Sequence, residues 1–143
     1  EGKSKKGLYP AVHSYSTDLH SLGQMVQDGE RTMIETFLTV KNPSVNLTVP
    51  SDYDDFEGLN FVAGKTFHEI NTMAFLGTKE AHVEGGVPIL AIELNKIDAE
   101  TIGELLYFFE LACAIYVYNL DSNPFDQPGV EGYKKAMYRL LGK

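Results

Sequence analysis

A short stretch of the sequence offers one titratable ring beside two amides. Residues 16–29 have the apolar spacing of a helix, and this helix places His20, Gln24 and Gln27 together on its polar face. A histidine changes its charge near neutral pH, so that His20 could exchange protons at cellular pH. A solvated helix face with an incidental histidine has the same spacing, and the residues alone leave both interpretations open.

A second residue suited to proton chemistry is Lys134, near the end of the chain. It borders the apolar stripe of a predicted last helix, which is formed by Val130, Tyr133, Met137 and Leu140. A lysine in this position can extend along a packed surface towards a site. An ordinary lysine that covers apolar surface and keeps its ammonium in water would have the same spacing.

The other motifs that could bind a ligand are incomplete. Four carboxylates lie within residues 52–57, but they lack the ordered spacing and the turn glycine of an EF-hand, so that a solvated loop is expected. Gly64-Lys65-Thr66 matches the end of a P-loop without its first glycine or a preceding strand. No pair among His13, His68 and His82 has the spacing of a zinc helix, and we expect surface or packing residues.

The elements that must position these side chains alternate between helix and strand. We expect helices at about 16–29, 60–84, 98–119 and 128–140, and strands at 32–40 and 87–94. A strand, a long helical connection and a second strand predict parallel pairing. The second strand is apolar enough to be largely buried. The fold class is therefore α/β, helix-rich with a small parallel sheet.

Single residues predict where the helices begin and end. Asp98 is expected to cap the third helix, and Gln127 and Pro128 to occupy the cap and the first position of the last one. Gly29 is expected to end the first helix in the left-handed conformation. Gly85-Gly86 is expected to end the second helix.

The bulk composition excludes some partners. The 143 residues have the size of one domain, and the net charge of −8 offers no basic face for nucleic acid and opposes binding to an anionic membrane surface. The longest apolar run, residues 105–118, is interrupted by Glu110 and is expected to be too short for a bilayer of about 30 Å. Cys113, the only cysteine, fits a reducing compartment and is expected to pack in the core. No signal peptide is expected, and the initial Glu1 suggests a chain that begins inside a longer polypeptide.

Four segments spread along the chain resemble the C-terminal part of the bacterial glucose-6-phosphate isomerase family. They are residues 17–24 (TDLHSLGQ), 85–88 (GGVP), 107–114 (YFFELACA) and 123–135 (NPFDQPGVEGYKK). The resemblance implies an isomerase of glycolysis and gluconeogenesis that interconverts glucose 6-phosphate and fructose 6-phosphate. Ring opening and proton transfer through a cis-enediol are general acid–base steps, and no organic cofactor or metal ion is implied.

The resemblance also implies an architecture and a setting. The family has two sugar isomerase (SIS) domains, each a three-layer αβα sandwich with a parallel sheet. Residues 1–143 would be the C-terminal part of the second SIS domain plus the C-terminal helix. The whole enzyme would be a cytoplasmic homodimer, with the histidine contributed across the dimer interface and the active site between the domains.

Three residues match functional positions of the family. His20 occupies the position of the histidine associated with ring opening, and Lys134 that of the catalytic lysine, whose ammonium could donate to the ring oxygen. Gln127 matches a glutamine that binds the sugar phosphate substrate.

The carboxylate base of the family falls outside the chain. It opens a Glu-Ser-Glu/Asn-Gly-Lys motif of which only the tail, Glu1-Gly2-Lys3, is present, so that the base should lie two residues before Glu1. The phosphate-binding Ser/Thr loop belongs to the missing N-terminal domain. We therefore expect the chain alone to be inactive, to expose apolar surface and to self-associate.

Two alternatives to an enzyme fragment remain open. A non-catalytic SIS module that binds sugar phosphates would need a cluster of phosphate donors, for which Ser14, Ser16 and Thr17 are the tightest group. A structural dimerisation domain would tolerate the loss of His20 and Lys134.

Overall fold

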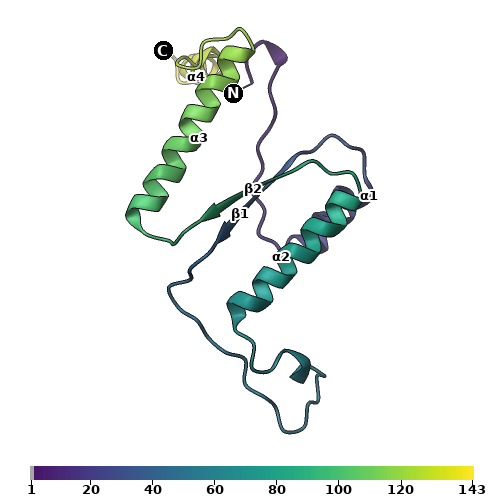
Figure 1. The fold of residues 1–143 in the computed structure, drawn as a ribbon. Helices are drawn as coiled ribbons and strands as arrows, with labels where there is room; N and C mark the ends of the chain where they lie inside the picture. Colours follow the sequence, from purple (N-terminus) through teal and green to yellow (C-terminus); the bar gives the residue numbers. More distant parts are fainter. Residues whose placement is uncertain (1) are drawn as a thin grey trace. The chain divides into compact units, whose positions relative to one another are not determined.

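The computed structural model describes residues 2–143 and divides them into two compact units (Figure 1). The first, called here the central unit, comprises residues 13–101. The second, called here the terminal unit, combines residues 2–12 with residues 102–143. Each unit is built from segments whose ends the sequence largely specifies.

The central unit is organised around a two-stranded parallel sheet. β1 (Glu35–Val40) pairs with β2 (Ile89–Leu94) in a register that places Glu35 opposite Ile89. The predicted parallel pairing and the α/β class are confirmed. The expected burial of β2 is wrong, because Leu90 is 61% exposed. A parallel strand is buried only where other layers cover both of its faces.

Two helices accompany this sheet, α1 (Leu19–Asp28) and α2 (Phe67–Glu84). α2 begins later than expected because Thr66 and Glu69 form a capping box. The Glu69 N–H donates to Thr66 Oγ1 at 3.1 Å, and the Thr66 N–H donates to Glu69 Oε2 at 2.7 Å. These backbone and side-chain bonds from Thr66 hold the pKa of Glu69 below its usual range. A 3-10 turn, η2 (Asn60–Val62), occupies the start of the predicted helix, and α2 ends before Gly85 as predicted.

Gly29 ends α1, but not in the predicted left-handed conformation. Its φ of −79° and ψ of −174° are extended. A glycine is still required, because a Cβ there would lie 2.3 Å from the Met25 carbonyl oxygen and 2.6 Å from its sulfur. The close approach of the chain to the last turn of α1 thus explains the residue type.

The acidic loop before α2 is closed by one amide. The Asp52 N–H donates to Asn60 Oδ1 at 2.8 Å, while Asn60 Nδ2 donates to the Asp52 carbonyl at 2.7 Å. The Asn60 N–H donates to Asp55 Oδ1 at 2.9 Å. Across residues 2–143, no group of three or more His, Cys, Asp or Glu side chains is arranged to hold a metal ion.

The terminal unit contains a short 3-10 turn and two helices. These are η1 (Lys3–Lys5), α3 (Ala99–Asn119), which starts in the central unit, and α4 (Pro128–Leu140). Asp98 caps α3 as predicted, since its Oδ1 accepts from the Thr101 N–H at 2.9 Å. Lys96 lies 2.5 Å from the same carboxylate, and with Thr101 it lowers the pKa of Asp98 to about 2.

The expected core packing of Cys113 is wrong, because this side chain is exposed. The apolar residues of α3 are distributed around the whole helix, but Val117 is the only one of its residues that is buried. Among the residues that the structure describes, the buried apolar side chains are Val26, Val87 and Val117. The apolar stripe of α4 is also uncovered, with Tyr133 63% exposed. The expected exposure of apolar surface is thus confirmed.

α3 is longer than the predicted apolar run. It has 21 residues and contains an 18-residue window with a mean hydropathy of 1.4, so that by length and composition it could cross a membrane, contrary to expectation. A single helix of this length and hydropathy is weak evidence for a membrane protein, because a core helix of a soluble protein can be equally long and apolar.

Candidate functional site

His20 is the second residue of α1, and its side chain is exposed. Its backbone N–H donates to the Thr17 carbonyl at 3.2 Å. Within residues 2–143, the imidazole makes no hydrogen bond and no ion pair. The ring is therefore accessible for proton exchange with a ligand.

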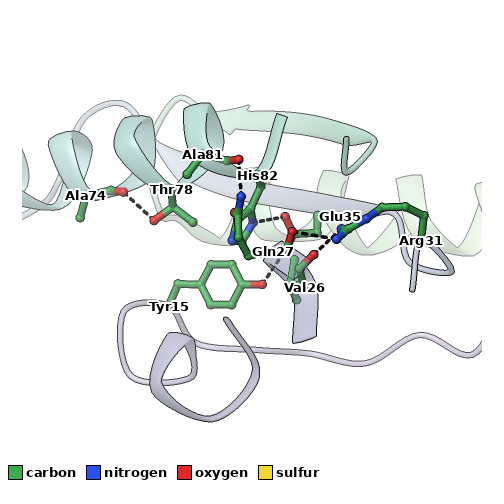
Figure 2. Close-up of polar contacts among 9 residues, drawn as sticks. All are labelled: Tyr15, Val26, Gln27, Arg31, Glu35, Ala74, Thr78, Ala81 and His82. Atoms are coloured by element: carbon green, nitrogen blue, oxygen red, sulfur yellow. Dashed lines mark hydrogen bonds and ion pairs between the residues drawn. The ribbon is translucent and has the colours of Figure 1, made fainter. Parts of the chain in front are cut away.

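A partly buried polar cluster of Tyr15, Glu35 and His82 holds the segment that leads into α1 (Figure 2). The Tyr15 hydroxyl donates to Glu35 Oε1 at the start of β1. His82 Nδ1, from the last turn of α2, lies 2.7 Å from Glu35 Oε2. The Tyr15 ring meets the His82 ring edge-on, with centroids 6.2 Å apart. His82 is 3% exposed, so that of the two roles expected for it, packing is the one observed.

Burial, followed by the hydrogen bond to Glu35 and its negative charge, raises the pKa of Tyr15. The unfolded chain therefore releases this proton at a lower pH than the folded one. The stability that Tyr15 contributes is complete below the ordinary tyrosine pKa of about 10 and is lost as the pH rises beyond it.

Replacing Tyr15 by phenylalanine should destabilise the full-length protein by about 1–2 kcal/mol at neutral pH, because Glu35 loses a donor. The variant should also lose less stability than the wild type above about pH 10. Thermal unfolding across this range measures both effects. Tyr53→Phe is the matched control, because Tyr53 is 100% exposed. Equal unfolding temperatures for Tyr15→Phe and the wild type would contradict the role of the cluster.

The C-terminal end of α1 is hydrogen-bonded to α2. Gln27 Nε2 donates to the Ala81 carbonyl at 2.9 Å, as Figure 2 shows. Arg31 donates to the carbonyls of Val26 and Gln27. Its positive charge is also favourable at this C-terminal end of α1, which is the negative end of the helix dipole. A Cβ at Gly85 would lie 2.7 Å from Gln27 Nε2, so that glycine allows this approach.

The two glutamines of the predicted polar face of α1 therefore have different surroundings. Gln27 is engaged with α2 and positions the helix, whereas Gln24 Nε2 lies 3.4 Å from Asp28 Oδ2 on the exposed side. Together with Tyr15, Gln27 holds α1 at both ends. His20 is thus presented from a helix whose position two independent contacts fix.

Sequence reasoning missed the cluster of Tyr15, Glu35 and His82. Its members are separated by 20 and 47 residues, so that no local spacing links them. A weak signal was present, since Glu35 is the only charged residue of β1 and stands at its start. A carboxylate in that position needs polar partners.

Gln127 and Lys134 lie in the terminal unit, Gln127 directly before α4 and Lys134 within it. Pro128 is the first residue of α4, as predicted, and Gln127 occupies the cap position without a side-chain cap bond. Lys134 Nζ lies 2.9 Å from Glu131 Oε1, and the lysine side chain is 42% exposed. Exposed pairs of this kind contribute little stability, so that the ammonium can exchange Glu131 for a ligand.

The structure places the candidate residues in different units. His20 lies in the central unit, while Gln127 and Lys134 lie in the terminal unit. Glu1, the residue aligned with the third position of the base motif, lies outside the described residues. That His20 and Lys134 act on one substrate stays a prediction.

Comparison with known proteins identifies clear relatives. No family model matches the chain. It is 54% identical over all 143 residues to the glucose-6-phosphate isomerases of Staphylococcus haemolyticus strain JCSC1435 and Staphylococcus aureus strain Newman. The crystal structure of a hypothetical protein from Thermus thermophilus has the same fold over 90% of this chain and 31% of its own, with a TM-score of 0.84 and 23% identity. The resemblance found in the sequence is confirmed: along its whole length the chain is similar to glucose-6-phosphate isomerases, of which it spans 32%.

Proposed function

We propose that the chain is the C-terminal part of an enzyme that interconverts glucose 6-phosphate and fructose 6-phosphate. One observation carries this proposal, namely the 54% identity that extends over every residue of the chain to enzymes named glucose-6-phosphate isomerase. The accessible imidazole of His20 and the half-exposed ammonium of Lys134 are compatible with it.

In this proposal the described residues divide the acid–base work. His20 moves protons during ring opening, and Lys134 donates to the ring oxygen, which carries developing negative charge. Gln127, at the start of α4, binds the substrate. The carboxylate that transfers the proton between C1 and C2 lies two residues before Glu1, in the remainder of the enzyme.

The same proposal extends to the architecture. Residues 1–143 form the C-terminal part of a second SIS domain plus the C-terminal helix, and β1 and β2 join further parallel strands in a three-layer αβα sandwich. The exposed faces of α3 and β2 support this view, because further layers would cover them. The full-length enzyme acts in the cytoplasm as a homodimer.

The test is the conversion of fructose 6-phosphate to glucose 6-phosphate by the full-length protein. A coupled dehydrogenase assay measures the glucose 6-phosphate that is formed. We expect turnover in the ordinary enzyme range of about 1–10³ s⁻¹. A folded but inactive protein would overturn the proposal and favour a non-catalytic module that binds sugar phosphates.

A further inference from the structure

Lys3 joins the beginning of the chain to the turn that precedes α4. Its Nζ donates to the Asn123 carbonyl and lies 2.7 Å from Asp126 Oδ1. These two acceptors stand at the two ends of a four-residue turn, which Gln127 follows directly. The Lys3 side chain is only 14% exposed, and the largest cause that lowers the pKa of Asp126 is its hydrogen bond with Lys3.

The turn itself has a defined conformation. Asn123 Oδ1 accepts from the Phe125 N–H at 3.0 Å, which is an Asx turn, and the Phe125 ring packs edge-on against Tyr118 of α3 with centroids 6.3 Å apart. The segment that carries Lys3 is held a second time, since the Leu8 N–H donates to Tyr116 Oη at 3.1 Å. Lys3 thus connects two ordered parts of the terminal unit.

The length of chain on either side of this connection is short. The expected base lies four residues before Lys3, and four extended residues span at most about 14 Å. In the other direction, Lys134 lies on α4 seven residues after the cap residue Gln127, which is about 10 Å along the helix axis. A contact at Lys3 therefore limits how far the segment that carries the base can lie from the helix that carries Lys134.

We propose that Lys3 is a positioning residue of the isomerase, which sets the segment that carries the carboxylate base against the turn and helix that carry Gln127 and Lys134. This inference rests on the proposed function. Lys3 touches no reacting atom in it; its ammonium holds the Asn123 carbonyl and the Asp126 carboxylate. Proton transfer between C1 and C2 depends on the geometry that this contact maintains.

The experiment compares Lys3→Met with the wild type in the full-length enzyme. Misplacement of a catalytic group by about 1 Å can lower a rate about 10²-fold, so that kcat should fall about 10–100-fold while KM for fructose 6-phosphate changes far less. Lys3→Arg keeps the charge and the donors, and should recover most of kcat. In an Asp126→Asn background, the further loss caused by Lys3→Met should be smaller, because the two residues are coupled.

Lys6→Met is the matched control, because it removes the same charge from the same segment. The Lys6 side chain is exposed and, within residues 2–143, makes no hydrogen bond or ion pair. Wild-type kcat in Lys3→Met overturns the inference, as does an equal loss in Lys6→Met or a loss of thermal stability without a loss of kcat. An inactive wild-type enzyme, which is assayed first, would instead overturn the proposed function on which the inference depends.

Discussion

Replacing His20 or Lys134 by alanine in the full-length enzyme is expected to lower kcat for fructose 6-phosphate by about 10²–10⁴-fold, the usual contribution of a positioned acid or base. His20→Ala removes the imidazole that α1 presents to solvent, and Lys134→Ala removes the ammonium from α4. Neither side chain is part of a buried network, so that the fold should survive both changes. Steady-state kinetics with circular dichroism separate lost chemistry from lost structure.

The chain offers a matched control for each variant. His68→Ala removes another imidazole of the central unit, and Lys135→Ala removes the neighbouring ammonium of α4. Within residues 2–143, neither control side chain makes a hydrogen bond or an ion pair. Both controls should keep nearly full activity. Undiminished turnover in His20→Ala or Lys134→Ala would contradict the assigned acid–base roles.

The second large effect concerns the chain by itself. The isolated 143 residues should show no isomerisation above the rate in buffer, because they lack the carboxylate that transfers the proton between C1 and C2 of the sugar. The same assay, run at high concentrations of the isolated chain, tests this expectation. The uncovered apolar faces predict self-association in the same sample, which sedimentation would detect.

Supplying the rest of the polypeptide as a separate chain is the appropriate control for this experiment. Recovery of turnover on mixing would show that the isolated chain is competent but incomplete. Substantial turnover by the isolated chain would place the base within residues 1–143. The alignment of Glu1 with the third position of the motif would then be wrong.

Local patterns predicted much of the fold. The order of helices and strands, the parallel pairing, the cap at Asp98 and the start of α4 at Pro128 all follow from periodicity and end signals. The start of α2 could have been placed correctly, because Thr66 and Glu69 have capping-box spacing. Burial was less predictable: Cys113 and Leu90 lie in apolar runs, but what covers them is not specified by those runs.

The candidate site was predictable only in part. Spacing singled out His20 and Lys134 as suitable residue types, whereas their roles and that of Gln127 came from resemblance. The contacts that position them join residues distant in sequence, such as Tyr15 with Glu35 and Lys3 with Asp126. Such pairs depend on the tertiary fold, because neither partner has a local pattern that points to the other.

The two-stranded sheet makes the order of synthesis important for the proposed enzyme. Within the described part of the chain, β1 and β2 pair only with each other, so that each leaves an open edge of backbone donors and acceptors. Open edges recruit strands from other molecules. In the enzyme proposed here, the N-terminal part leaves the ribosome first, and its strands are available when β1 and β2 emerge. Synthesis in this order shortens the time during which a nascent chain can pair with another copy.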